Sequence, residues 1–158
     1  MQITNCCQLS CFVFIINIVI GIYYNYYLYS FLFLLLLITS LIHHSNYTDF
    51  TYVIDKTLCA YVVLYGTLLF FQKGKEHFTL LNYNNTILNT IFNTKFLFYV
   101  KSILFISVVV AFLIVLGLYY YGYYTKQYVF DADLLTGLKT HSLIHYLSAY
   151  AHSVIMLL

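Results

Sequence analysis

The feature that most constrains this chain is the length of its apolar runs, which very few charges interrupt. The longest run, FLFYVKSILFISVVVAFLIVLGLYYY at residues 96–121, contains a single charged residue, Lys101. A helix of about 20 apolar residues is long enough to cross the hydrocarbon core of a bilayer. Only 8% of the 158 residues are charged, against about 25% in an ordinary soluble domain, which is too few to cover a water-facing surface. We therefore expect an integral membrane protein.

The apolar runs predict an all-α, polytopic transmembrane protein with three to five spans, forming one membrane domain over residues 1–158. Two spans are expected at about 57–72 and 96–121. The region before residue 43 has two solutions. Either two spans are joined at the segment GIYYNYY, or one long helix crosses at a tilt. The two-span solution is favoured because glycine, asparagine and tyrosine suit an interface better than the middle of a bilayer. The ranges for these solutions are about 3–22 with 27–42, or 12–42 alone.

The last 18 residues, HSLIHYLSAYAHSVIMLL, place three histidines on one side of a helix. At about 100° per residue, His141, His145 and His152 share a stripe, and leucine, isoleucine and valine take the opposite side. This pattern predicts an amphipathic helix at about 138–158. It either lies in the membrane interface or inserts with its polar stripe against protein.

The histidines are the candidate ligands for haem or metal, namely the stripe of His141, His145 and His152 and the pair His43 and His44 at a span end. Two histidines four residues apart suit a metal, and histidine also titrates near neutral pH, so a proton relay stays open as well. Structural contact with headgroups or with a neighbouring subunit is the favoured interpretation. We predict no catalytic residue and no metal site.

The cysteines do not form a recognisable framework. Cys6, Cys7 and Cys11 lack the Cys-x2-Cys spacing of zinc sites, and Cys59 stands alone in a span. We interpret all four as small apolar residues of helices.

No ionisable side chain lies in the middle of a predicted span. The acidic residues are all expected in connecting segments, at Asp49, Asp55, Glu76, Asp131 and Asp133. Membrane subunits that translocate protons or ions, or that hold redox centres, need charges or ligands within the bilayer. We therefore expect a subunit that packs and seals, is not an enzyme by itself, and has no redox cofactor of its own.

Lysine placement predicts the orientation of the spans. The segment 73–95 is expected to be a loop and carries Lys73, Lys75 and Lys95 against one acid, while the flanking segments are more acidic. The positive-inside rule places this lysine-rich segment in the matrix if the membrane is mitochondrial. The same lysines are the candidate lipid-binding residues, because cardiolipin and other anionic phospholipids attract clustered cations.

Composition resembles that of proteins encoded in AT-rich mitochondrial genomes of protists. The chain has no arginine, proline or tryptophan, and it has 19 tyrosines and 14 phenylalanines. The first basic residue is Lys56, so neither a signal peptide nor an arginine-rich transit peptide is expected. The resemblance implies a multi-pass protein of the mitochondrial inner membrane. In the alternative, a protein of the endoplasmic reticulum, Asn46 and Asn84 would be glycosylation acceptors.

The layout of spans and the segment AYVVLYGTLLFF resemble the sixth membrane subunit of complex I. In that family the third span has a tyrosine, a glycine and an apolar run at a local helix irregularity, and Tyr65 (or Tyr61) with Gly66 match it here, without the family spacing. The resemblance implies a structural or accessory subunit of a respiratory complex, complex I or complex IV. The alternatives are the haem- and quinone-binding anchor of complex II and an accessory subunit of ATP synthase. Expected partners are other subunits and lipids, not nucleic acid.

Overall fold

The protein is described here by a computed structural model, which defines the backbone at residues 5–87 and 92–158 and the side chains at 6–79 and 96–158. Within these residues the chain is helical almost throughout and contains no strand, which confirms the all-α prediction. The elements in chain order are α1 (Asn5–Cys11), α2 (Phe14–Tyr23), α3 (Tyr27–Ser45), α4 (Asp49–Ile87), α5 (Phe92–Leu116), the π-helix η1 (Gly117–Tyr121), α6 (Gly122–Thr125), the short 3-10 helix η2 (Tyr128–Phe130) and α7 (Leu134–Leu157).

In the described part of the chain, four stretches are long and apolar enough to cross a membrane. This number lies within the predicted range of three to five, and the protein is a polytopic helical membrane protein. The first stretch joins α1 and α2 across a short break, and the others follow α3, α4 and α5 with α6. Their bounds are Cys6–Tyr23, Tyr27–Ser45, Asp49–Thr79 and Phe96–Thr125.

The region before residue 43 contains two antiparallel helical segments rather than one long helix. The chain turns between α2 and α3 at Asn25, whose φ of 64° is in the left-handed region that asparagine tolerates better than most residues. The amide of Tyr26 donates to the carbonyl of Gly21 at 2.7 Å, which closes the end of α2. The long-helix alternative over 12–42 is therefore wrong.

Helix α4 extends well beyond the predicted span at both ends. It begins at Asp49 and continues to Ile87, so the predicted loop at 73–95 is largely helical, with α5 starting at Phe92. Residues 88–91 lie outside the described part. The prediction of a loop is wrong because the charged residues of 73–76 end the apolar run but not the helix. Charges on a helix that leaves the bilayer are compatible with its continuation into water.

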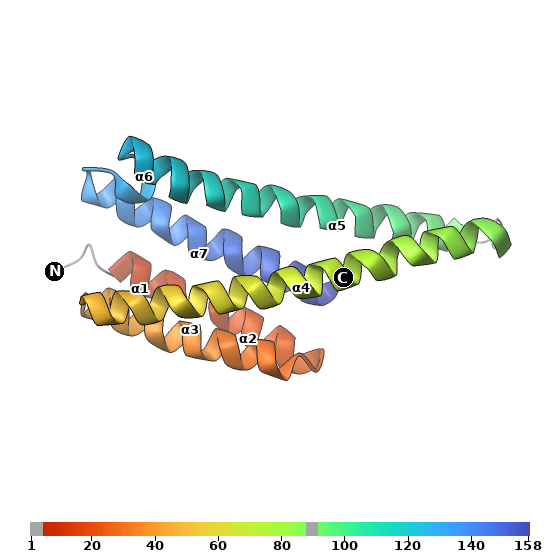
Figure 1. The fold of residues 1–158 in the computed structure, drawn as a ribbon, viewed down its shortest axis with the longest axis horizontal. Coiled ribbons are helices and arrows are strands. Elements are labelled where there is room, and N and C mark those ends of the chain that lie inside the picture. The colour runs from red at the N-terminus through yellow and green to blue at the C-terminus, as the bar shows by residue number, and fades with distance from the viewer. Residues whose placement is uncertain (1–4, 88–91) are drawn as a thin grey trace.

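Helix α7 is inserted in the bundle. Figure 1 shows it between α5 on one side and the α1–α3 region on the other, with its first turn at the same end as the end of α3 and the start of α4. Small residues on its buried face let the neighbouring helices approach closely. They are Gly137, Ser142, Ala149, Ala151 and Ser153.

The start of α7 is fixed by Asp133. Its carboxylate accepts hydrogen bonds from the amides of Leu135 and Thr136 and from the Thr136 hydroxyl, the last at 2.6 Å. The hydrogen bonds from Thr136 hold the pKa of this exposed carboxyl below its usual value. Asp133 therefore acts as an N-cap, which the sequence analysis had placed only in a connecting segment.

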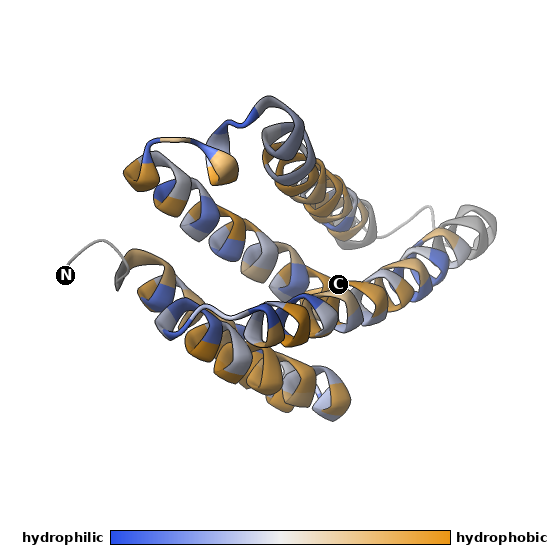
Figure 2. Cartoon of the chain, turned by 60° about the vertical axis from the view of Figure 1, so that its left-hand side comes forward, coloured by the Kyte–Doolittle hydropathy of each residue, from blue (hydrophilic) through white to orange (hydrophobic). Residues whose placement is uncertain are grey.

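Hydropathy colouring separates the outer helices from α7. Figure 2 shows hydrophobic colour along α2, α3 and α5, and hydrophilic colour in turns of α7 and in the links between α3 and α4 and between α6 and α7. The four spans expose many large apolar side chains, such as Ile106 and Leu113 of α5, while histidine, serine and asparagine side chains are buried. A lipid environment favours this distribution, with apolar side chains outside and polar side chains inside the bundle.

Gly66 brings α4 close against Tyr29 of α3 and His152 of α7. A methyl group on Gly66 would lie 2.7 Å from the Nδ1 and Cε1 atoms of His152 and would also collide with the Tyr29 hydroxyl. Helix α4 is regular through Tyr65 and Gly66, so the local irregularity implied by the complex I resemblance is not present there. Gly66 serves close packing instead.

We predict that Gly66→Ala lowers the unfolding free energy in detergent micelles by about 1–3 kcal/mol, the usual cost of overpacking a core. The matched control is Gly74→Ala in the same helix, where the nearest neighbouring atom would lie 3.7 Å away. That variant should be neutral or gain up to about 1 kcal/mol from helix propensity. Equal unfolding midpoints by circular dichroism for the two variants would contradict this packing.

Candidate functional site

The polar face of α7 points into the bundle. His145 and His152 are 8% and 2% exposed, and their partners come from α1 and α3 of the same chain. We had expected this stripe to face headgroups or a neighbouring subunit, and that expectation is wrong for these two histidines. It failed because the partners lie more than 120 residues away in sequence, where the periodicity of a single helix gives no information.

The deeper of the two histidines forms a buried pair with a tyrosine. The Tyr29 hydroxyl is hydrogen-bonded to the Nδ1 atom of His152. The rings of Phe33 and Phe112 lie edge-on to the His152 ring at centroid distances of 5.4 and 5.1 Å. An apolar wall therefore surrounds one polar contact, and neither group has water to replace its partner.

This pair lies level with the middle of two spans. Gly66, which contacts it, is close to the centre of the span Asp49–Thr79, and Phe112 is close to the centre of Phe96–Thr125. An ionisable side chain is thus present at mid-span depth, contrary to the sequence expectation. The expectation is wrong because it considered only the predicted spans. Helix α7 is not one of them, yet it lies inside the bundle and brings its histidines to this depth.

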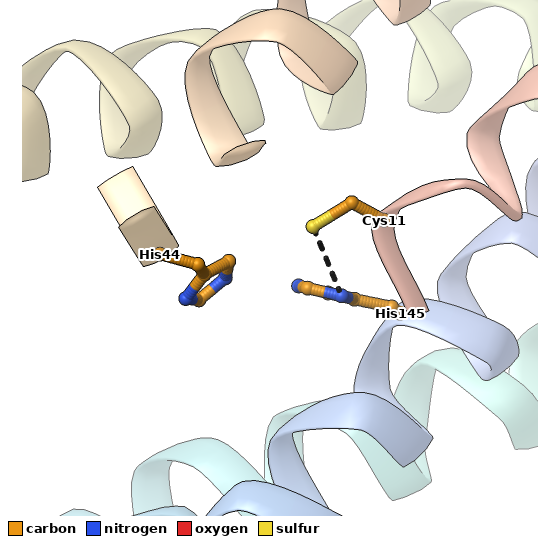
Figure 3. A group of neighbouring side chains, drawn as sticks. All are labelled: Cys11, His44 and His145. Carbon is orange, nitrogen blue, oxygen red and sulfur yellow. Dashed lines mark hydrogen bonds between the residues drawn. The ribbon is translucent and has the colours of Figure 1, made fainter. Parts of the chain in front are cut away.

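A second histidine group, here called the end cluster, lies near the first turns of α7 and consists of Cys11, His44, His141 and His145. One ligand atom from each of Cys11, His44 and His145 can be chosen so that all three lie within 4.8 Å of one another (Figure 3). The His141 ring is 4.8 Å from the His145 ring and 5.0 Å from the His44 ring, centroid to centroid. Helices α1, α3 and α7 each contribute to the cluster.

A short hydrogen-bond chain orients His145. Its Nδ1 atom is 2.8 Å from the Ser10 hydroxyl, and that hydroxyl donates to the Cys7 carbonyl at 2.8 Å. A serine hydroxyl has one proton, so with that proton committed to Cys7 it accepts the Nδ1–H of His145. The Nε2 atom then keeps its lone pair. In Figure 3 the imidazole of His145 points toward the ring of His44.

A cavity of about 280 Å³ opens beside the end cluster. His44 and His141 line it, together with Cys7, His43, Lys56 and Tyr119 among others. The volume is slightly below the roughly 300–1,000 Å³ of pockets for drug-sized ligands. An ion or a small molecule fits this space better than a porphyrin does.

One ion pair borders the cavity. Lys56 Nζ lies 3.2 Å from a carboxylate oxygen of Asp55, and the Ser40 hydroxyl donates to the other oxygen. Asp55 is 2% exposed. It lies inside α4 and not in a connecting segment as expected, and the lysine and serine contacts compensate its buried charge.

The remaining predicted site residues are not part of the end cluster, although His43 adjoins it, with its ring 5.2 Å from that of His44. His43 is buried at the end of α3, where its ring packs 5.1 Å from that of Tyr47. Lys73 is half-buried with its ammonium 5.8 Å from the Tyr26 ring centroid, and Lys75 is exposed on α4. The side chain of Lys95 lies outside the described residues.

Cys11 and Ser10 are the site residues that the sequence analysis missed. Both are fully buried next to His145, and the Cys11 sulfur is 3.9 Å from the Nδ1 atom of that ring. The available signal was spacing, because Cys7 and Cys11 are four residues apart on one helix, as are His141 and His145 on another. Two such pairs on facing helices can converge.

The chain was compared with known protein families, curated proteins and solved structures. No family, curated protein or solved structure matches it. The end cluster offers a thiol and three imidazoles, and the hydrogen bond with Ser10 orients the imidazole of His145. This donor set suits zinc or copper among biological metals.

We predict that Tyr29→Phe lowers the unfolding free energy by about 1–3 kcal/mol, because the His152 nitrogen loses its partner in a dry environment. Tyr61→Phe is the matched control on a tyrosine that is 56% exposed, and it should change stability by less than about 0.5 kcal/mol. Denaturant titration of both variants in the same detergent measures the difference. A stable Tyr29→Phe variant would show that the hydroxyl contact does not contribute.

Proposed function

We propose that this protein is a non-catalytic, structural subunit of a respiratory complex in the mitochondrial inner membrane, either complex I or complex IV. An accessory subunit of ATP synthase is the second assignment within the same class. The observation that carries the proposal is the apolar outer surface of the spans, which leaves a large packing area for other helices and lipid.

Helix α5 gives the clearest example of this surface. Only 11% of the most apolar stretch of the span Phe96–Thr125 is buried within the chain, against 39% for α3. Its outward residues include Ile103, Ile106, Val110 and Leu113, which are all exposed. Helices in a membrane associate through close packing and interhelical hydrogen bonds, and a β-branched and leucine-rich face of this length suits a neighbouring helix as well as lipid.

Tyrosines near the end of α5 add polar tips to that surface. Tyr120, Tyr121, Tyr123 and Tyr124 are all more than half exposed. Tyrosine rings gather at the level of lipid headgroups, and a buried tyrosine hydroxyl needs a hydrogen-bond partner. In the proposed assembly these hydroxyls meet headgroups or polar groups of adjacent subunits.

The mitochondrial assignment is supported by composition. A chain whose seven basic residues are all lysine and which lacks arginine, proline and tryptophan resembles products of AT-rich organelle genomes. Lys73 and Lys75 are proposed to contact cardiolipin or another anionic phospholipid, at about 1 kcal/mol per lysine near the surface.

We predict that an antibody against the segment at residues 46–53 detects this chain in a large assembly after mild detergent extraction of mitochondria and native gel electrophoresis. The chain should comigrate with the activity stain of complex I or of complex IV, because its exposed apolar faces are covered there by other subunits. Extraction with a harsh detergent should release it as a small species and serves as the control.

Two results would contradict the proposal. Migration as a single small species after mild extraction would show that no large partner exists. A shift on removal of an N-linked glycan, with Asn46 as the acceptor in the exposed link between α3 and α4, would place the chain in the endoplasmic reticulum.

A further inference from the structure

The end cluster brings three side chains that commonly bind metals close together. Cys11 and His145 are buried, His44 is half-buried, and their closest set of ligand atoms lies within 4.8 Å. Around a tetrahedral ion, a sulfur and a nitrogen ligand at the usual bond lengths are about 3.6 Å apart. To share one ion, these ligand atoms would have to approach one another by up to about 1.2 Å.

One nitrogen of His145 already makes the kind of hydrogen bond that holds most metal-bound histidines in place. A ligating imidazole usually donates its other N–H to an oxygen, which fixes the tautomer and the ring orientation. Here the Nδ1–H donates to the Ser10 hydroxyl at 2.8 Å, and Ser10 is itself held by the Cys7 carbonyl. The Nε2 lone pair is therefore available to an ion.

His141 lies beside the three ligands, and the cavity gives an ion a path to them. His141 lies one helical turn before His145, and its ring is within 5.0 Å of the His44 ring centroid. Both His44 and His141 line the cavity of about 280 Å³, so an ion entering from that side meets them first. Cys11 and His145, which are buried, then complete with His44 a set of one sulfur and two nitrogens.

The net charge of the occupied site favours Cu(I) over Zn(II). Thiolate and imidazole ligands favour zinc or monovalent copper over magnesium, calcium and manganese. The site is buried, and Lys56 nearby is already neutralised by Asp55. One thiolate with Cu(I) gives a neutral centre, whereas the same thiolate with Zn(II) leaves a buried positive charge without a partner, which is costly.

We propose that Cys11, His44 and His145 bind one Cu(I) ion at this end of the bundle, with His141 at the cavity side of the site. Binding exchanges the thiol proton of Cys11 for the copper–sulfur bond, and that proton is released to solvent through the cavity. No change in oxidation state is involved. The proposal does not depend on the function proposed above, since it concerns the isolated chain.

The test uses the full-length chain, purified in detergent under reducing, oxygen-free conditions and titrated with Cu(I) against a chromophoric Cu(I) chelator. We expect one equivalent of copper to be withheld from the chelator per chain. X-ray absorption at the copper edge should show one sulfur and two or three nitrogen neighbours. Bound copper should also raise the unfolding temperature of the unmodified protein, because it binds only the folded state.

Variants assign the site to these residues. Cys11→Ser and His145→Gln should abolish copper retention. Ser10→Ala should weaken it by about 10- to 100-fold, because the hydrogen bond that orients His145 is lost. The matched controls are Cys59→Ser and His77→Gln, a thiol in α4 and a histidine that stacks on Phe98 away from the cluster. Both controls should retain copper.

Three results would overturn the proposal. They are no copper withheld from the chelator by the unmodified chain, retention unchanged in Cys11→Ser, or displacement of Cu(I) by an equimolar amount of Zn(II). Because Cys11 is buried, each variant is first compared with the unmodified chain by circular dichroism. If Cys11→Ser does not fold, the Ser10→Ala result and the copper-dependent rise in unfolding temperature decide the matter.

Discussion

The hydrogen bonds made by the inward face of α7 hold this bundle in register. A buried polar group without a partner costs about 1–3 kcal/mol, so each polar residue of α7 fixes the height of the helix that supplies its partner. His145 is hydrogen-bonded to Ser10, and His152 to Tyr29. The Asn17 side-chain amide donates to the Ala149 carbonyl and is also hydrogen-bonded to the Ser153 hydroxyl. These links tie α1, α2 and α3 to one central helix. Sliding α7 by one turn would break all of them together, whereas apolar faces alone tolerate such a shift.

The apolar content of the chain was sufficient to predict its class, because a segment with almost no charge has one stable environment. The periodicity of residues 141–158 also placed His141, His145 and His152 on one face correctly. What it could not predict was the partner of that face. In a membrane, lipid and protein are both apolar, so the pattern of a single helix does not say which neighbour covers it. The partners of His145 and His152 are set by tertiary packing alone.

Charged residues misled the prediction of boundaries in the same way at two places. Asp55 was assigned to a connecting segment because an isolated carboxylate is costly in a bilayer, yet Lys56 and Ser40 satisfy it within α4. Lys73 was assigned to a loop, yet it continues the same helix and contacts the Tyr26 ring. In both cases a neighbouring side chain compensates the charge, and the hydropathy of the sequence gives no information about such contacts. The sequence also did not predict the end cluster, because Cys11 and His145 are far apart in the chain and meet only through tertiary packing.

The length of α4 has a mechanical consequence. Its 39 residues extend about 58 Å, roughly twice the thickness of the hydrocarbon core. Figure 1 shows α4 and α5 projecting together past the end of α7, without the other helices around them. This projecting part is held by contacts between α4 and α5, such as the stacking of His77 on Phe98, so a small change of tilt within the lipid produces a larger displacement at its far end. A change in bilayer thickness would thus displace the end of α4 at residues 80–87 more than its start at Asp49.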